Sequence, residues 1–339
     1  MYTLPLAGFI VQLEGLPPQW QETERSLMVT LFPGARSWAS ASLLRQLKGL
    51  GFAAEMPDPF AMALGAKCRV YWWEHMACGG LWIGRRTRRL SEAIDATTHL
   101  DRAAAWRGWV ASCFFSNVLQ AQRQLEVLAA SAQLSVDLLL QGSSADPTPK
   151  HQWQRRCIAV LRHPDAQGLH CHLRARLDRW HLQLLPGHRV RRMEAALACI
   201  GALVPPCVCA ATLKAMLDGW TTADSRRQTS QCLFGCQQGR DGIMHYAYCP
   251  CVARLASARL RLQPAPAAAR LDDFLLLHGQ PGARHLALRA LCLYATFMAT
   301  NAVRNGKAAV AGDAWIQAMV EGASRDPPLA GIVRTLWRT

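Results

Sequence analysis

The stretch that most constrains the fold of this chain is Cys232-Leu-Phe-Gly-Cys236-Gln-Gln-Gly-Arg-Asp-Gly-Ile-Met-His245-Tyr-Ala-Tyr-Cys249. It spaces three cysteines and one histidine as C-x3-C-x8-H-x3-C. Zn²⁺ prefers four tetrahedral nitrogen or sulfur ligands, and a closed set of three cysteines and one histidine is typical of a structural site. The spacing therefore predicts one structural zinc ion bound by Cys232, Cys236, His245 and Cys249.

Two neighbouring residues support this interpretation, and a third leaves the fourth ligand open. Gly235 precedes Cys236, where a tight turn brings two thiolates towards one ion. Pro250 suits a chain that turns after its last ligand. Cys251 lies two residues past Cys249 and could replace it as a ligand. The alternative to a metal site is a chance cluster in a chain with 13 cysteines.

Further positions around the ligands form a wider pattern. They are Gly219-Trp220-Thr221-Thr222, Arg226, the Cys-x-Phe-Gly-Cys element, Asp241-x-Ile243-x-His245-Tyr246 and Cys249-Pro250. Together these residues resemble the C-terminal zinc-knuckle region of non-LTR (LINE-like) retrotransposon reverse transcriptases. In those enzymes the CCHC knuckle follows the polymerase and thumb regions.

The first forty residues resemble the thumb of the same polymerases more loosely. The matching positions are Leu4-Pro5-Leu6, Gln12-Leu13, Leu16-Pro17, Glu24 and the segment from Pro33 to Trp38. An ordinary pair of amphipathic helices separated by a proline stop is the alternative for this segment.

The resemblance implies a module that binds RNA or single-stranded DNA. Unpaired bases stack on aromatic side chains, while guanidinium groups bind phosphates. We therefore expect Trp220 and Tyr246 to stack on bases, and Arg226, Arg227 and Arg240 to contact the backbone. The alternative for the two aromatic residues is packing around a small metal core.

The composition favours the same partner. The net charge is +15 in 339 residues, and the excess comes mostly from Arg, whose planar guanidinium binds phosphate in a bidentate manner. We expect nucleic acid as the partner ahead of an anionic membrane surface, and no small-molecule substrate. An inert basic surface is the alternative.

The cysteines and the N-terminal residues indicate an intracellular protein, nuclear or cytoplasmic. The start of the chain, Met1-Tyr-Thr-Leu-Pro5, lacks the basic and long apolar regions of a secretory signal. Reduced thiols fit an odd number of cysteines better than a disulfide framework does. The most apolar window, residues 286–303, contains Arg289 and Asn301 and predicts a buried helix rather than a membrane span.

Helical periodicity dominates the chain. It predicts a mainly α fold of helical bundle regions with a small zinc-stapled knuckle, and little pattern in the last residues. The predicted segments are a thumb-like helical region at 1–140, a linker at 141–150, a basic helical connector at 151–216, the CCHC knuckle at 217–252 and a helical tail at 253–339.

The sequence predicts no catalysis. A polymerase needs carboxylates that hold two Mg²⁺ ions, and the one adjacent acidic pair is Asp272-Asp273. This pair follows the knuckle and precedes an apolar run, so we predict that it caps a helix N-terminus. The chain then corresponds to the C-terminal part of a reverse transcriptase whose catalytic palm lies upstream or has been lost. The alternative is a retroelement-derived structural or interaction protein that does not bind nucleic acid.

Overall fold

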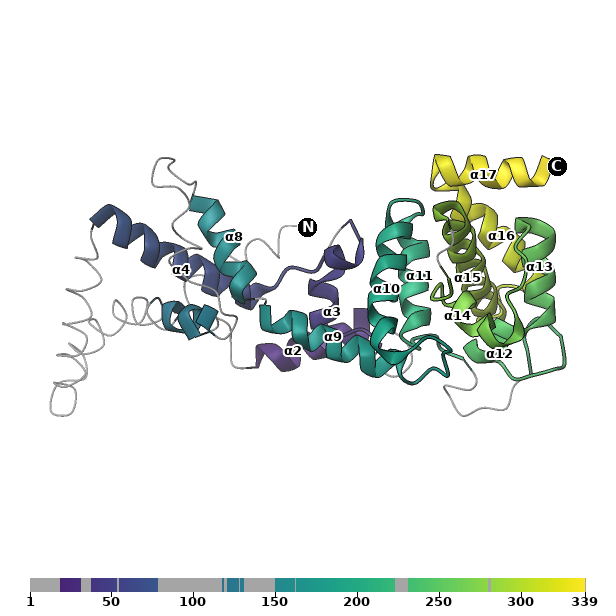
Figure 1. The fold of residues 1–339 in the computed structure, drawn as a ribbon, viewed down its shortest axis with the longest axis horizontal. Coiled ribbons are helices and arrows are strands. Elements are labelled where there is room, and N and C mark those ends of the chain that lie inside the picture. Colours follow the sequence, from purple (N-terminus) through teal and green to yellow (C-terminus); the bar gives the residue numbers. More distant parts are fainter. Residues whose placement is uncertain are drawn as a thin grey trace. The chain divides into compact units, whose positions relative to one another are not determined.

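The fold is described from a computed structural model of the chain (Figure 1). The residues that it describes are 19–31, 38–53, 55–78, 118, 121–127, 129–130, 150–161, 163–222, 231–279 and 282–338. This described part is mainly helical, which confirms the predicted fold class. Its β structure consists of one isolated antiparallel bridge between Gln231 and Arg240.

The chain divides into two compact units. Unit 1 comprises Met1–Glu22 and Pro57–Gln167, and unit 2 comprises Thr23–Met56 and Gly168–Thr339. Helices α2 (Trp20–Leu31) and α9 (His163–Leu177) each cross a boundary between them. Residues 1–18, in the thumb-like segment, and residues 141–149 of the predicted linker lie outside the described part. The predicted domain boundaries therefore stay predictions.

Unit 1 contains a pair of packed helices, α4 (Pro59–Cys78) and α8 (Lys150–Leu161). Gly65 allows their close approach, because a Cβ atom there would lie 2.8 Å from the side chain of Ile158. Cys68 and Cys157 are both buried in the small apolar cluster of this unit. Unit 1 thus has a core of its own.

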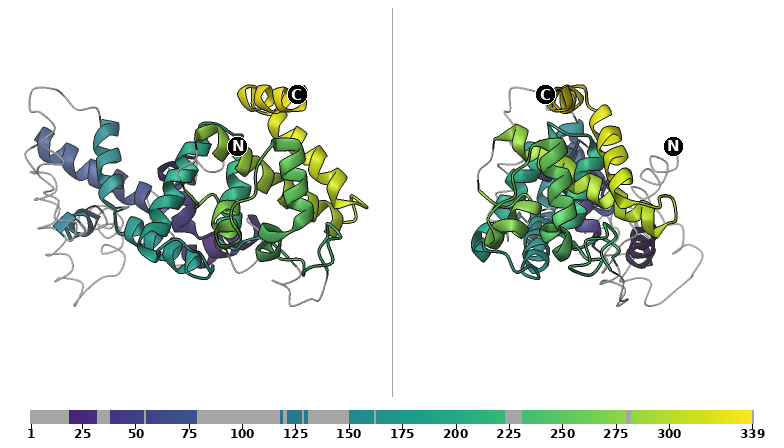
Figure 2. Two further views of the ribbon diagram at one scale, coloured as in Figure 1. Left: turned by 45° about the vertical axis from the view of Figure 1, so that its right-hand side comes forward. Right: turned by 90° about the vertical axis from the view of Figure 1, so that its right-hand side faces the viewer.

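Unit 2 carries the larger core. Its described elements are α3 (Ala41–Arg45), η2 (Leu47–Leu50), α10 (Pro186–Gly201), α11 (Pro206–Met216), α12 (Ile243–Tyr248), α13 (Pro250–Leu260), η3 (Ala267–Ala269), α14 (Arg270–Phe274), α15 (Ala283–Arg304), α16 (Ala311–Ser324) and α17 (Pro327–Arg338). Helices α10 and α11 run side by side next to α15, and α16 packs along the other side of α15 (Figures 1 and 2).

Helix α15 is the centre of unit 2. By length and composition alone it is apolar enough to cross a membrane, yet 67% of its most apolar window is buried against neighbouring helices. Leu291, Leu293 and Ala295 are fully buried, as expected for a core helix surrounded by others. The helix predicted for residues 286–303 is therefore present, and it is mostly buried.

The tail predicted at 253–339 is helical, but its last residues were expected to show little pattern and instead form two further helices, α16 and α17. Helix α16 buries Trp315 and Met319, and α17 buries Leu329 and Val333. Gly322 brings α16 close to α15, because a Cβ atom there would lie 2.8 Å from the Tyr294 ring. The close approach at Gly322 depends on a residue of another helix, so the sequence of α16 alone does not reveal it.

The acidic pair lies in the first turn of α14, as predicted, but the N-cap residue of this helix is Ala269 and no side chain makes a capping hydrogen bond there. Asp272 is buried in the first turn of α14, and its carboxylate accepts the backbone N–H groups of Gln183 and Leu184 at 3.1 and 2.9 Å. Asp273 pairs instead with Arg289 of α15. Both carboxylates therefore connect segments that are distant in the chain.

Candidate metal centre

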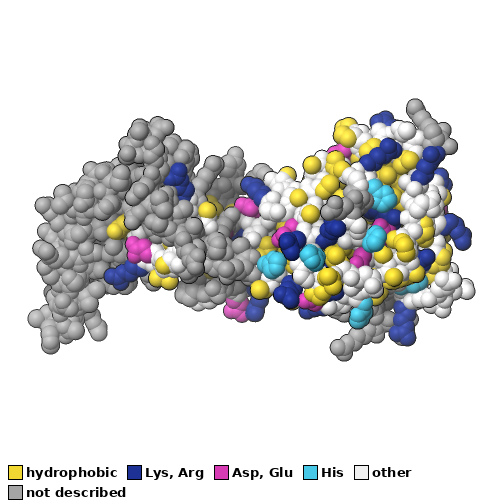
Figure 3. Space-filling view, in the orientation of Figure 1, with side chains coloured by type: hydrophobic (Ala, Val, Ile, Leu, Met, Phe, Trp, Pro, Cys, Tyr) yellow, Lys and Arg dark blue, Asp and Glu magenta, His cyan; other side chains and the backbone are white. Residues whose placement is uncertain are grey.

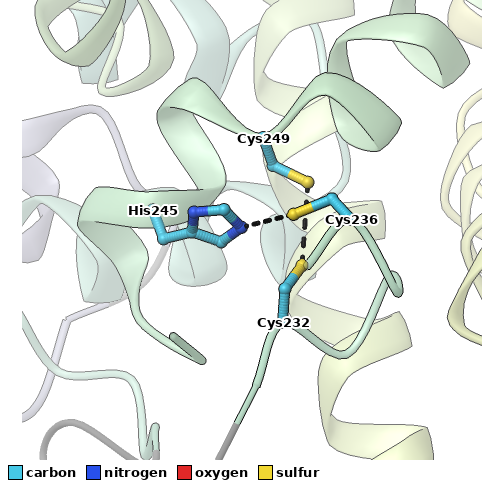
Figure 4. Close-up of side chains that lie close together, drawn as sticks. All are labelled: Cys232, Cys236, His245 and Cys249. Atoms are coloured by element: carbon cyan, nitrogen blue, oxygen red, sulfur yellow. Dashed lines mark hydrogen bonds between the residues drawn. The ribbon is translucent and has the colours of Figure 1, made fainter. Parts of the chain in front are cut away.

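The predicted ligand residues converge in unit 2. Cys232 and Cys236 lie on the loop before α12, His245 lies within α12, and Cys249 lies at its end. Their side chains point into one space (Figure 4). The four possible ligand atoms all lie within 4.8 Å of one another. These residues therefore form a cluster that could hold a metal ion.

The separations suit a tetrahedral ion. Thiolates about 2.3 Å from a tetrahedral centre lie about 3.8 Å from one another. The sulfur atoms of Cys232 and Cys249 are 3.7 Å apart, and His245 Nε2 lies 3.1 Å from the Cys236 sulfur. Small shifts of the side chains suffice to place the three sulfurs about 2.3 Å and the imidazole nitrogen about 2.0 Å from one ion.

Backbone N–H groups point at the sulfur atoms. The N–H groups of Cys236 and Phe234 donate to Cys232, which favours its thiolate and acts to lower its pKa. Cys249 is the N-cap of α13, and its sulfur accepts the N–H groups of Val252 and Cys251. A helix N-terminus stabilises an anion. Cys251 thus contributes its backbone N–H, and its own sulfur is not part of the cluster.

The sulfur atoms of Cys232 and Cys249 lie within hydrogen-bonding distance of each other. The hydrogen bond between them acts to lower the pKa of Cys232 and to raise the pKa of Cys249. The lowered pKa makes Cys232 the member of the pair that more readily becomes a thiolate. A divalent cation would displace the thiol protons, because thiolates are the form of cysteine that binds metals.

Two glycines shape the loop. Gly235 has φ +72°, a left-handed conformation that glycine adopts at little cost. Gly239 packs against the imidazole, because a Cβ atom there would lie 2.2 Å from His245 Nδ1. Nδ1 therefore faces the Gly239 backbone while Nε2 faces the cysteines. The sequence pattern pointed to Gly235 and missed Gly239.

A buried ionic network anchors the loop to α15. Asp241 is 1% exposed and accepts two hydrogen bonds from Arg304, with Nε 2.9 Å from Oδ2. The Tyr246 hydroxyl donates to the same carboxylate. Burial and this acceptor raise the pKa of Tyr246. The network fixes α12, which carries His245, against a helix more than fifty residues away in sequence.

The structure corrects the predicted base-stacking residues. Trp220 is fully buried and packs on Phe274 and Phe297, with ring centroids 6.4 and 5.1 Å away. Tyr246 is 1% exposed. Both rings are therefore buried. Tyr246 packs against Phe234 and His245, in agreement with the alternative of packing around the metal core, whereas Trp220 packs on residues of α14 and α15.

Of the three arginines predicted to contact phosphates, the structure describes one. Arg240 is exposed beside the metal cluster, while Arg226 and Arg227 lie outside the described residues. On the face drawn in Figure 3, the Lys and Arg side chains are scattered among hydrophobic ones and do not gather in one patch. The positive charge of unit 2 is thus spread over this face.

Sequence reasoning missed two exposed side chains on α12. Met244 and Tyr248 are 37% and 40% exposed, and their spacing of four residues places them on one face of the helix. The sequence could have indicated these exposed positions, because residues 243, 245, 246 and 249 belong to the core or to the ligand set. Met244 and Tyr248 lie between these positions and therefore face the solvent.

Comparison of the chain with protein families, with curated proteins and with solved structures finds no match. The resemblance to retrotransposon reverse transcriptases therefore rests on the motif residues alone and stays a prediction.

Proposed function

We propose that this chain is a nucleic-acid-binding protein, folded around one structural zinc ion, that corresponds to the thumb and knuckle part of a non-LTR retrotransposon reverse transcriptase. The observation that carries the proposal is the convergence of Cys232, Cys236, His245 and Cys249 within 4.8 Å. The proposed partners are RNA and single-stranded DNA.

Zinc is the ion that the donor set favours. Three sulfurs and one imidazole suit Zn²⁺, whereas Mg²⁺ and Ca²⁺ take oxygen ligands. Four protein ligands leave no position for a reacting water, so the ion has a structural role. A closed site of this kind contributes on the order of 10 kcal/mol to folding.

Nucleic acid is the partner that the charge favours. The chain carries an excess of 15 positive charges, and the exposed Arg240 lies next to the metal cluster. Neutralising phosphates with such groups releases counterions, so binding weakens with salt.

The metal part is tested by elemental analysis of purified protein. We expect about one zinc per chain, lost in Cys249→Ser and kept in Cys251→Ser. Cys251 is a matched control because its sulfur lies outside the cluster although its backbone lies next to Cys249. Zinc retained in Cys249→Ser, or lost in Cys251→Ser, would overturn the ligand assignment.

The partner is tested by titrating the zinc-loaded chain into labelled single-stranded RNA and DNA at several salt concentrations. We expect the logarithm of the association constant to fall linearly with the logarithm of the salt concentration. The slope should be roughly −0.7 for each phosphate contacted. No binding at low salt favours the second candidate, a structural or interaction protein that keeps the zinc site. The observation that favours this candidate is the burial of Trp220 and Tyr246.

A further inference from the structure

A pocket lies beside the metal cluster in unit 2, between α12, α13, α14 and α15. Its walls are mostly apolar side chains, including Ala253 and Ala256 of α13 and Phe274 of α14, and they also include the carboxylate of Asp273. Tyr248 lines it as well, and this ring is 40% exposed. An aromatic ring is therefore accessible to solvent at the edge of an apolar pocket.

Two guanidinium groups line the same pocket, and only one is fully engaged. Arg289 pairs with Asp273 and donates to the Gln263 carbonyl and to His285. Arg270 donates through Nε to the Ala265 carbonyl at 3.3 Å. Its two terminal nitrogens have no partner within the described part of the chain. Arg270 is thus the cation at this pocket that can take an anionic ligand.

The metal cluster positions the pocket. Helix α12 carries Tyr248 between two ligand residues, His245 within the helix and Cys249 directly after it. An ion that binds both residues fixes the direction of the Tyr248 side chain. Ligand binding at the pocket should then depend on the metal.

We propose that one unpaired nucleobase of a single strand binds at the mouth of this pocket, stacked on the exposed ring of Tyr248, with Arg270 bonded to the adjoining phosphate. Bases in single strands stack on exposed aromatic rings, and guanidinium groups bind phosphate oxygens. An apolar pocket with one aromatic edge and one free cation offers both contacts. This inference rests on the proposed function and assigns the nucleotide contact to residues that the motif did not indicate.

The experiment measures the affinity of the full zinc-loaded chain for matched oligonucleotides, in RNA and DNA form, with normal or abasic residues. We expect the wild-type chain to prefer the base-bearing strand. Tyr248→Ala should lose about 5- to 150-fold in affinity for that strand, the range for one stacked base, and should bind the abasic strand as the wild type does. Tyr248→Phe should retain the preference, because it keeps the ring.

Arg270→Gln should weaken binding of both strands and reduce the salt dependence by about the contribution of one phosphate. Arg334→Gln is the matched control, since Arg334 also bonds a backbone carbonyl through Nε but lies on α17. Leu185→Ala controls for the loss of an exposed apolar side chain. Zinc content and circular dichroism identify any variant that fails to fold. If Tyr248→Ala fails to fold, the Tyr248→Phe variant and the abasic strands still test whether the ring stacks on a base.

The outcomes separate the two proposals. A chain that binds the strands with no preference for bases, or a Tyr248→Ala variant that keeps the preference, overturns the pocket assignment and leaves the proposed function standing. A chain that binds neither strand at low salt overturns both. If chelation of zinc leaves the preference for bases unchanged, the metal does not position the pocket, which contradicts the inference.

Discussion

At the scale of single residues, the metal cluster depends on contacts that the ligand spacing does not reveal. Gly239 is the clearest case, because its missing side chain leaves room for the His245 ring. Loss of a group that orients a metal-binding histidine typically lowers metal affinity by 10- to 100-fold. The loop therefore needs a glycine at a position that carries no ligand.

We predict that Gly239→Ala lowers zinc affinity by about 10- to 100-fold, because the new methyl group displaces the imidazole. Competition with a chromophoric chelator measures the affinity. Gln238→Ala is the control, since Gln238 is exposed in the same loop. Equal affinities for the glycine variant and the wild type would show that the ring does not depend on this contact.

His172 of α9 gives a prediction about pH. Burial, followed by the nearby Arg176, lowers the pKa of His172 below its ordinary value of about 6.5. Between that lowered pKa and about pH 6.5, the unfolded chain binds a proton that the folded chain does not. The free energy of unfolding should therefore fall as the pH is lowered through this window.

Urea unfolding at a series of pH values tests this. In His172→Gln the loss of stability towards acid should be smaller than in the wild type, while His170→Gln, at an exposed position on the same helix, should follow the wild type. The metal ligands also take up protons in acid, but they do so in all three proteins. The same pH slope in His172→Gln and wild type would contradict the assignment.

At the scale of elements, sequence reasoning succeeded where the determining contacts are local. The ligand spacing identified the cluster because its four residues lie within one short loop and helix. The apolar window at residues 286–303 identified α15. Asp241 was recognised only as part of a motif, because its partner Arg304 is contributed by a distant helix. The burial of Trp220 and Tyr246 likewise could not be predicted, because it depends on packing against distant segments that a local sequence pattern does not reveal.

The buried Asp241–Arg304 ion pair should contribute to the stability of the fold. Arg304→Gln leaves a buried carboxylate without its cation, so we expect a loss of stability on the order of 3 kcal/mol. The double variant Arg304→Gln/Asp241→Asn removes the orphaned charge and should recover part of that loss. Urea unfolding of the zinc-loaded protein measures both.

Arg334→Gln serves again as the control, because an exposed arginine contributes little to stability. A double variant no more stable than Arg304→Gln would mean that the charge on Asp241 is not what Arg304 compensates.

At the scale of the whole molecule, the metal cluster belongs to unit 2 and touches the helices that form its core. Unit 1 has its own apolar cluster around Cys68 and Cys157. The predicted domain limits differ from these units because the chain leaves unit 2 after residue 56 and returns at residue 168. Such a return depends on contacts between distant segments, which composition and periodicity do not report.

We predict that removing zinc increases amide hydrogen exchange across residues 231–260 and at the end of α15, where Arg304 lies. The ion holds the loop, and the loop holds Arg304 through Asp241. Exchange in α4 and α8 of unit 1 should stay unchanged. Mass spectrometry of proteolytic fragments, with and without a chelator, provides the measurement. Uniform protection in both states would show that the ion does not stabilise this part of unit 2.

Zinc K-edge X-ray absorption of the purified chain tests the central claim most directly. The account predicts one ion per chain with three sulfur ligands at about 2.3 Å and one nitrogen ligand at about 2.0 Å. A spectrum dominated by oxygen ligands, or one with fewer than three sulfurs, would contradict the site at Cys232, Cys236, His245 and Cys249.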